Sequence, residues 1–400
     1  MTRAVVLGGG FAGVLAAAVL ARHADDVLLV EGDRYPSVPL SRRGLPQAHH
    51  SHVLVTGGAR ALEELLPGTL KALYARGAHR RDLTGDALIL SADGWFARHD
   101  TGAYLISCTR ALLDHVVRRR ALRGITVWPD TVALGLTGDA GRVTGVTVGR
   151  AGGPPQTVEA DLVVDATGRR SKAPSWLAGL GAPRIEETVI ASELAYATRL
   201  YRAPAGRAAA TPAIMIHPHP DGPARGATLF PIEDGRWVVT LTGDPPMKEP
   251  GFTAFARNLR SPLVGELMAA ATPLGRIRPY RDTADRRRFF ERAPLPEGVL
   301  AIGDAVVAVN PVHSHGMSIA ALTALRLDRE LAGHGGVKPC RTPELQAAVA
   351  EVADPSWRMA VGQGGAPRHT LLSRAALTSH QLATRIFRAQ TLIAEQESTP

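Results

Sequence analysis

The chain has 400 residues, of which 45% are hydrophobic, and its formal net charge is +9. This length suits one large or two intertwined domains, no segment reaches the ~18 consecutive apolar residues of a membrane helix, and two cysteines support neither a disulfide framework nor a cysteine-based zinc site. The arginines are scattered without interleaved aromatics, and no secretory signal is evident, so we expect a cytoplasmic protein with no membrane span and no nucleic-acid partner.

The first thirty-one residues predict a strand, a glycine turn, a helix and a second strand. Ala4 to Leu7 is a continuous apolar run of the kind found in strands buried on both faces. Phe11 to Arg22 is rich in Ala, Leu and Val and predicts a helix that packs on the sheet. Val27 to Val30 is the second strand, and Glu31 follows at its carboxyl end.

The turn between strand and helix carries the pattern Gly8-x-Gly10-x-x-Gly13. The three glycines permit a tight turn, close approach of the backbone to a pyrophosphate, and close packing of helix on strand. The start of the helix, at Phe11 and Ala12, offers free N–H groups and a positive dipole to phosphates. Glu31, about 20 residues further on, is placed to accept ribose hydroxyls. The pattern therefore predicts a dinucleotide site without choosing between NAD and FAD.

Later segments divide the chain into three regions. Helices are predicted over 58–77 and 109–123, a β-meander over 125–149, a buried strand in "ADLVVDATG", and a helix from about Ser318. Alternating segments between 183 and 292 predict a mainly antiparallel sheet, and 342–398 predicts helices broken at Pro355 and at Gly364-Gly365. We therefore expect a cofactor domain over 1–182 and 293–340, an inserted substrate domain over 183–292, and a C-terminal helical region over 341–400.

Two later motifs favour FAD. A nicotinamide-dependent dehydrogenase would normally continue with further βα units, whereas this chain returns to the same site through "DLVVDATGRRS" and "GVLAIGDAVVAVNP". Each is a buried strand that ends beside an acidic residue. Asp304, after Gly303, is placed where a carboxylate can accept a hydrogen bond from a ribityl or ribose hydroxyl.

Together the three motifs resemble the group A FAD-dependent monooxygenases. The likeness is greatest to the flavin epoxidases and related oxygenases of bacterial polyketide and polyether biosynthesis, through "SRRGLPQAHHSHVL", "VVDATGRRSKAPSWLAGLG" and "LPEGVLAIGDAVVAVNPVHSHGMSIAAL", and it spans about residues 3–330. It implies an α/β fold: a glutathione-reductase-type, Rossmann-like FAD-binding domain with an inserted, mainly antiparallel sheet and C-terminal helices.

The resemblance also implies roles for individual residues. Glu31 would bind the adenosine ribose, and Val132 would meet adenine through its backbone. Arg43 and Gln47 would lie near the flavin or its phosphates, and Arg110 near the pyrophosphate or ribitol. The remaining expected cofactor contacts lie in the last motif: Gly303, Asp304, Pro311, and the backbone N–H groups of Gly316 and Met317.

The segment "PVHSHGM" departs from the family, which usually has an aromatic–Gly–Gln–Gly run there. His313 and His315 replace part of that run. Two histidines in one loop supply at most two metal ligands, so we expect no metal. We expect instead that both imidazoles lie on the substrate side of the flavin, with solvated side chains as the alternative.

The function implied by the resemblance is oxygen transfer. Reduced FAD would react with O2 to give a C4a-(hydro)peroxide, which would epoxidise or hydroxylate a small lipophilic natural-product precursor of polyketide or terpenoid type. Electrons would come from NAD(P)H or from a separate flavin reductase. A flavin oxidase or dehydrogenase and a non-catalytic flavin-binding protein are the alternatives, and the oligomeric state stays open.

Overall fold

The computed structural model describes residues 1–150, 152–244, 246, 248–362 and 371–393. Its centre is a five-stranded parallel sheet in the order β19-β11-β1-β2-β7. These strands are β1 (Arg3–Leu7), β2 (Asp26–Val30), β7 (Thr126–Trp128), β11 (Leu162–Asp165) and β19 (Val299–Ala301). Parallel strands end at the same edge of the sheet, and four of the five lead directly into a predicted motif or into Glu31. Segments that are distant in the chain therefore meet at the carboxyl ends of the strands.

Helices cover this sheet and join it to the rest of the chain. α1 (Phe11–Leu20) follows β1, and α8 (Gly316–Gly333) packs against both α1 and α2. The other helices are α2 (Thr56–Leu65), α3 (Thr69–Tyr74), α4 (Arg110–Ala121), α5 (Ala173–Gly179), α6 (Gly251–Arg257), α7 (Leu263–Ala269), α9 (Thr342–Gly362), α10 (Leu371–Ala375) and α11 (His380–Gln390). The largest apolar core lies between the parallel sheet and its helices, and it includes fully buried side chains from β1, β2 and β11.

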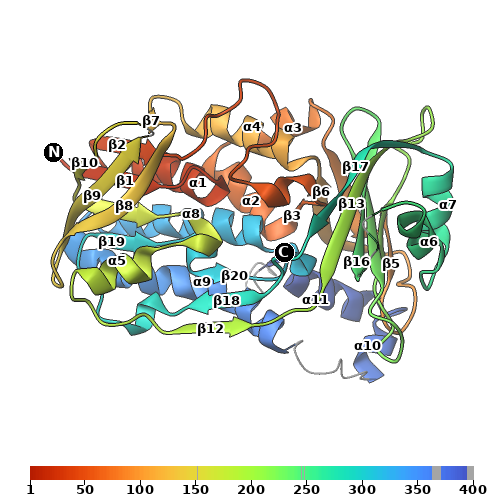
Figure 1. The fold of residues 1–400 in the computed structure, drawn as a ribbon. Helices are drawn as coiled ribbons and strands as arrows, with labels where there is room; N and C mark the ends of the chain where they lie inside the picture. Colours follow the sequence, from red (N-terminus) through yellow and green to blue (C-terminus); the bar gives the residue numbers. More distant parts are fainter. Residues whose placement is uncertain (151, 245, 247, 363–370, 394–400) are drawn as a thin grey trace.

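A six-stranded mixed sheet forms the other main body, at the opposite end of the molecule from the β8–β9–β10 sheet (Figure 1). Its order is β17-β13-β16-β15-β14-β5, antiparallel except where β5 meets β14. The strands are β5 (Ala87–Leu90), β13 (Ala195–Arg202), β14 (Ala213–Ile216), β15 (Gly226–Ile232), β16 (Arg236–Gly243) and β17 (Thr272–Tyr280). Because β5 comes from the N-terminal part, the interval 183–292 does not contain the whole sheet.

Three small sheets complete the fold. One contains β8 (Thr131–Gly138), β9 (Val143–Arg150) and β10 (Gln156–Glu159); a second contains β3 (Val53–Val55), β4 (His79–Thr84) and β6 (Asp100–Ser107); the third contains β12 (Glu187–Ile190), β18 (Asp285–Arg288) and β20 (Val307–Ala308). Short 3₁₀ turns are η1 (Pro46–His49), η2 (Gly168–Arg170), η3 (Phe290–Arg292), η4 (Gly303–Ala305), η5 (Pro311–His313) and η6 (Pro339–Arg341). The structure therefore has the expected α/β architecture, with a parallel sheet, antiparallel sheets and C-terminal helices.

Three predicted elements were wrong in detail. The helix predicted over 58–77 is two helices, because Pro67 and Gly68 (φ +81°) interrupt it. The strand at Thr126–Trp128 pairs in parallel with β2 rather than joining the meander. Pro355 lies inside α9 and does not end it, because buried residues on both sides, Ala353 and Ser356, keep the helix packed. The break predicted at Gly364-Gly365 lies outside the described residues.

Candidate functional site

The glycine turn after β1 leaves no room for a side chain at Gly8 or Gly13. Gly8 has a positive φ of +94°, and a Cβ there would lie 2.6 Å from the carbonyl oxygen of Ala166. A Cβ on Gly13 would lie 1.8 Å from the carbonyl oxygen of Gly8. Gly10, the N-cap of α1, offers no side-chain cap, the first turn holds no acidic residue, and a Cβ at Gly10 would meet nothing within 4 Å. The turn is thus tight on the sheet side and open at the helix end, which fits a pyrophosphate.

Glu31 lies beside this turn, as predicted. Glu31 is 8% exposed, and its carboxylate accepts hydrogen bonds from the backbone N–H groups of Gly9 (2.6 Å) and Asp33 (2.8 Å). Arg42 forms an ion pair with it at 3.2 Å. A buried, charge-balanced carboxylate at the end of β2 is suited to accept ribose hydroxyls.

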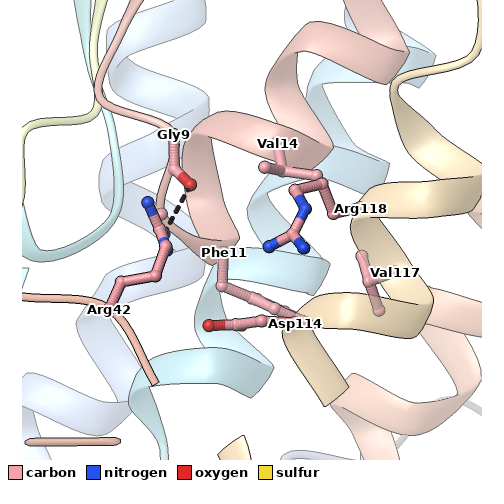
Figure 2. Close-up of a pocket in the computed structure, with 8 residues that line it drawn as sticks. Gly9, Phe11, Val14, Arg42, Asp114, Val117 and Arg118 are labelled. Atoms are coloured by element: carbon pink, nitrogen blue, oxygen red, sulfur yellow. Dashed lines mark hydrogen bonds between the residues drawn. The ribbon is translucent and has the colours of Figure 1, made fainter. Parts of the chain in front are cut away.

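A group of cationic and aromatic side chains surrounds the turn and was missed by sequence reasoning. Figure 2 shows Arg42 donating to the carbonyl oxygen of Gly9, at 2.9 Å, with Arg118 on the other side of the pocket. The ring of Tyr35 lies 4.9 Å from the Arg42 guanidinium and 4.4 Å from that of Arg118, and its hydroxyl donates to Gly9. Burial raises the pKa of Tyr35. Two guanidinium groups at the open helix end complement a polyanion.

The inward arginine is Arg42, whereas the predicted one was Arg43. The side chain of Arg42 is almost fully buried and that of Arg43 is exposed. Adjacent residues in a loop face different ways, and the letters "RR" do not tell which one turns inward. Gln47, also predicted, lies half-buried in η1.

Asp304 brings the three motifs together. A Cβ added at Gly316 would lie 3.7 Å from Oδ1 of Asp304, and a Cβ added at Gly168 would lie 3.9 Å from Cβ of Asp304. Gly303 lies close to Ala12: a Cβ added at Gly303 would lie 2.8 Å from the Cβ of Ala12. Burial raises the pKa of the Asp304 carboxyl, while the positive charges of Arg169 and Arg110 act in the opposite direction.

The carboxylate of Asp304 makes no hydrogen bond or ion pair within the described ranges. Asp304 is half-buried, and a partly enclosed carboxylate without a described protein partner can accept hydrogen bonds from the hydroxyl groups of a ligand. Together with the open helix end and Glu31, it gives a donor and acceptor set that matches the ribityl, pyrophosphate and ribose groups of FAD.

Arg110 and Val132 occupy the flanks of this region. Arg110 is buried on the first turn of α4, where its Nε donates to Asp114 at 2.7 Å and its guanidinium lies 5.6 Å from the ring of Phe11. Val132, on β8, is 52% exposed and its Cγ1 would lie 3.5 Å from a Cβ on Gly32. Val132 therefore lies next to the residue that follows Glu31, on the side expected for adenine.

The loop before α8 leads into a helix start that no described side chain caps. Its N-cap, His315, supplies no side-chain cap, and the first turn, which holds Gly316 and Met317, has no acidic residue. Pro311 begins η5, and Asn310 caps that turn by accepting from the N–H of Val312 at 3.1 Å. Such a helix start stabilises negative charge placed against it.

The two predicted histidines differ in their surroundings. His315 is 2% exposed; its Nδ1 is 2.9 Å from the Ser356 hydroxyl in α9, and its Nε2 is 2.9 Å from the carbonyl oxygen of Gln390 in α11. Burial lowers its pKa to about 4. Both ring nitrogens thus contact the C-terminal helices, so these contacts do not support a substrate-lining role for His315. His313 is half-buried, with its ring 6.1 Å from that of His315, and its substrate-side role stays a prediction.

A buried network of hydroxyls and one imidazole lies on the face of the six-stranded sheet. His50 Nδ1 is 2.8 Å from the Thr198 hydroxyl, which is 2.7 Å from that of Thr240, and Ser51 is 2.7 Å from Thr240. The His50 ring lies 5.2 Å from that of Tyr280, whose pKa is raised by burial and further affected by nearby charges that include Asp304. Burial lowers the pKa of His50 to about 4.

A cavity of about 520 Å³ lies between this sheet face, η1 and the start of α4. Its walls combine apolar side chains with charged ones. The lining residues are Pro39, Leu40, Ser41, Ala48, His49, His50, Arg76, Cys108, Thr109, Ala111, Leu112, Thr198, Arg199, Leu200, Ile232, Glu233, Asp234, Arg236, Val238, Leu274, Gly275, Arg276 and Arg278. His50 and Thr198 belong both to this wall and to the hydroxyl network.

Within the part of the chain that the structure describes, no three or more His, Cys, Asp or Glu side chains are grouped so as to hold a metal ion. No helix among those same residues is both long and apolar enough to cross a membrane.

Comparison with known proteins places the chain in a family. The family model described as "FAD binding domain" matches residues 1–335. The chain is 31% identical over 379 residues to "Protein Rv3254" of Mycobacterium tuberculosis (89% of this chain, 78% of that protein), and 30% identical over 345 residues to "6-methylpretetramide 4-monooxygenase" of Streptomyces rimosus (80% and 72%). The flavin-dependent brominase Bmp2 superposes with a TM-score of 0.73 at 17% identity, covering 98% of this chain and 94% of the other. The chain therefore belongs to the FAD-binding monooxygenase family.

Proposed function

We propose that this protein is an FAD-dependent monooxygenase that hydroxylates or epoxidises an organic natural-product precursor. The observation that carries the proposal is the meeting of the glycine turn, Asp304 and the start of α8 at one place, in a molecule that also holds a cavity of about 520 Å³. Two relatives support it by their printed activities, 6-methylpretetramide 4-monooxygenase and the kynurenine 3-monooxygenase of Salinispora tropica, which is 29% identical over 352 residues.

When bound, reduced FAD supplies the oxygen chemistry: one atom of O2 enters the product and the other leaves as water. The chain's own residues bind and orient it. The N–H groups at the start of α1 would hold the pyrophosphate, Glu31 the ribose, and Asp304 a ribityl hydroxyl. The N–H groups of Gly316 and Met317 would face the flavin ring and stabilise negative charge there.

The cavity supplies the place for substrate. Its apolar side chains, among them Leu112, Leu200 and Val238, exclude water from a hydrophobic molecule. We assign electron supply to NAD(P)H, delivered either directly or through a separate flavin reductase. Polyketide- or terpenoid-like molecules are the substrate class that the apolar walls and the sequence resemblance favour together.

The test has two stages. Acid precipitation of the purified protein should release FAD into the supernatant, because no His or Cys lies in an evident flavin-attachment motif; a pellet that stays yellow would contradict non-covalent binding. Candidate aromatic and polyene substrates are then incubated with ¹⁸O2, FAD and NADPH, with and without a flavin reductase. We expect one ¹⁸O atom in the product, whereas hydrogen peroxide with an unlabelled, desaturated product would identify an oxidase instead.

A further inference from the structure

The charges that line the cavity are unbalanced. Five arginines but only two acidic residues contribute to its wall. Both acids are already engaged by Arg236, which contacts Glu233 at 3.2 Å and Asp234 at 2.8 Å. Arg199 is paired with Glu249 at 3.1 Å. The positive charge of the other arginines is therefore not neutralised by the acids of this wall.

Those arginines are Arg76, Arg276 and Arg278. Their guanidinium groups form no ion pair or hydrogen bond to any described residue. Arg276 and Arg278 lie together on β17, and the pKa of His49 across the cavity is lowered by burial and by the positive charges of both. Arg276 is exposed and Arg278 is half-buried, and both line the cavity.

The backbone of β17 is irregular next to Arg276. The register between β13 and β17 shifts between Thr198 and Leu200, and Gly275, next to Arg276, has a positive φ of +63°. Bulges of this kind re-aim side chains and are common beside active sites. The strand irregularity is therefore consistent with a positioned pair of arginines rather than with chance surface charge.

The other wall residues indicate that the rest of a ligand would be apolar. Leu200 and Leu274, which are register partners, and Leu112 from α4 present an apolar surface in the same cavity. A guanidinium group binds carboxylate or phosphate oxygens through two parallel hydrogen bonds, which a neutral polar group does not match. The cavity thus combines an apolar surface with an anion-binding one.

We propose that this cavity binds the acidic group of an amphipathic organic substrate, with Arg276 and Arg278 holding the carboxylate or phosphate and the leucines contacting the hydrophobic body. The inference rests on the proposed monooxygenase function and narrows its substrate to an organic anion. The same anion chemistry is present in the phosphates of a nicotinamide coenzyme, so the test includes that source.

The test is calorimetric titration of the FAD-loaded protein with matched pairs of neutral and acidic probes. The pairs are 2-naphthoate with 2-naphthamide and anthracene-9-carboxylate with its amide. In the wild type we expect each acid to bind at least about tenfold more tightly than its amide. Arg276→Gln and Arg278→Gln should each weaken acid binding by about tenfold while leaving amide binding unchanged. Arg257→Gln, in α6 and outside the cavity wall, is the matched control.

Other outcomes overturn the inference. Equal affinity for acids and amides in the wild type would do so, as would acid binding that survives both substitutions. If instead NADPH binding weakens and acid binding does not, the arginines hold coenzyme phosphates and the substrate assignment is wrong. FAD content and O2 uptake after reduction are measured on the same samples. A wild type without FAD or without flavin-dependent O2 uptake would contradict the proposed function itself, independently of acid binding.

Discussion

The glycine turn and the arginine-lined cavity are built in different ways. At the turn, the backbone itself excludes alternatives: Gly8 and Gly13 lie against carbonyl groups that a Cβ would overlap. The cavity is assembled by side chains from η1, α4 and four strands of the six-stranded sheet, segments that are far apart in the chain. A site fixed by backbone contacts tolerates few substitutions and leaves a short motif, whereas a site built from distant side chains can change its ligand and leaves none.

This contrast predicts the most severe loss at Gly13. In Gly13→Ala, the added Cβ would lie 1.8 Å from the carbonyl oxygen of Gly8, so β1 and α1 must separate and the pyrophosphate site is lost. We expect FAD affinity to fall by more than about a hundredfold, measured by fluorescence titration and by FAD content after purification. Gly333→Ala is the control, because a Cβ there meets nothing within 4 Å. FAD affinity near the wild-type value in Gly13→Ala would show that the turn adapts.

The next effect is expected at Asp304. Asp304→Ala removes a half-buried acceptor that, in our assignment, receives a ribityl hydroxyl, and a hydroxyl left unpaired in the bound FAD costs about 1–3 kcal/mol. FAD affinity should fall by roughly ten- to a hundredfold with the circular dichroism spectrum unchanged. Asp304→Asn keeps an acceptor and should lose less. Asp221→Ala, at an 87% exposed side chain, is the control; equal FAD affinity in both alanine variants would remove Asp304 from the site.

The two regions also differ in how far the sequence predicted them. The strand–turn–helix–strand unit, the position of Glu31 and the meeting of the three motifs follow from local rules of backbone shape and strand order, and the structure has them as expected. Tyr35 and Arg118 were missed because they reach the turn only through tertiary packing. The contact of Arg42 with Glu31 was missed because two adjacent arginines in a loop do not show which side chain faces the protein interior.

The cavity had no sequence signal at all. Arg276 and Arg278 belong to no motif of the sequence, and only the fold brings them to one cavity with residues of η1 and α4. The contacts of His315 depended likewise on α11, a helix that follows some 65 residues later and whose docking no local pattern reveals. The roles of Arg43, Gln47, Arg110, Val132 and His313 stay predictions.

The stability of the folded protein should depend on pH through His315. Its pKa of about 4 in the folded protein lies below the usual 6.5, because burial disfavours the charged ring. The unfolded chain therefore takes up a proton at a higher pH than the folded one, and stability is lost as pH falls from 6.5 toward 4. Between pH 6.5 and pH 5 the loss from one such histidine is about 2 kcal/mol.

The measurement is urea unfolding at pH 7 and pH 5. His315→Gln has no group to titrate, so its stability should fall less between the two pH values than that of the wild type, by up to the same ~2 kcal/mol. His219→Gln, at a half-exposed side chain, is the control. Parallel pH profiles for wild type and His315→Gln would show that the Ser356 and Gln390 contacts do not hold the ring neutral.

The smallest effect is expected on the sheet side, at Thr198. Its side chain is fully buried and its hydroxyl joins His50 to Thr240, so Thr198→Val preserves shape and removes only the hydrogen bonds. We expect a loss of about 1 kcal/mol in the free energy of unfolding, the usual net value of one hydrogen bond, with FAD affinity unchanged. Because His50 also lines the cavity, affinity for the acidic probes should shift by a few-fold at most, far less than in Arg278→Gln. Thr157→Val, on the exposed strand β10, is the control. A tenfold or larger loss of probe binding in Thr198→Val would mean that the hydroxyl network, and not the arginine pair, dominates recognition, and the contrast between a backbone-built cofactor site and a charge-built substrate site would have to be redrawn.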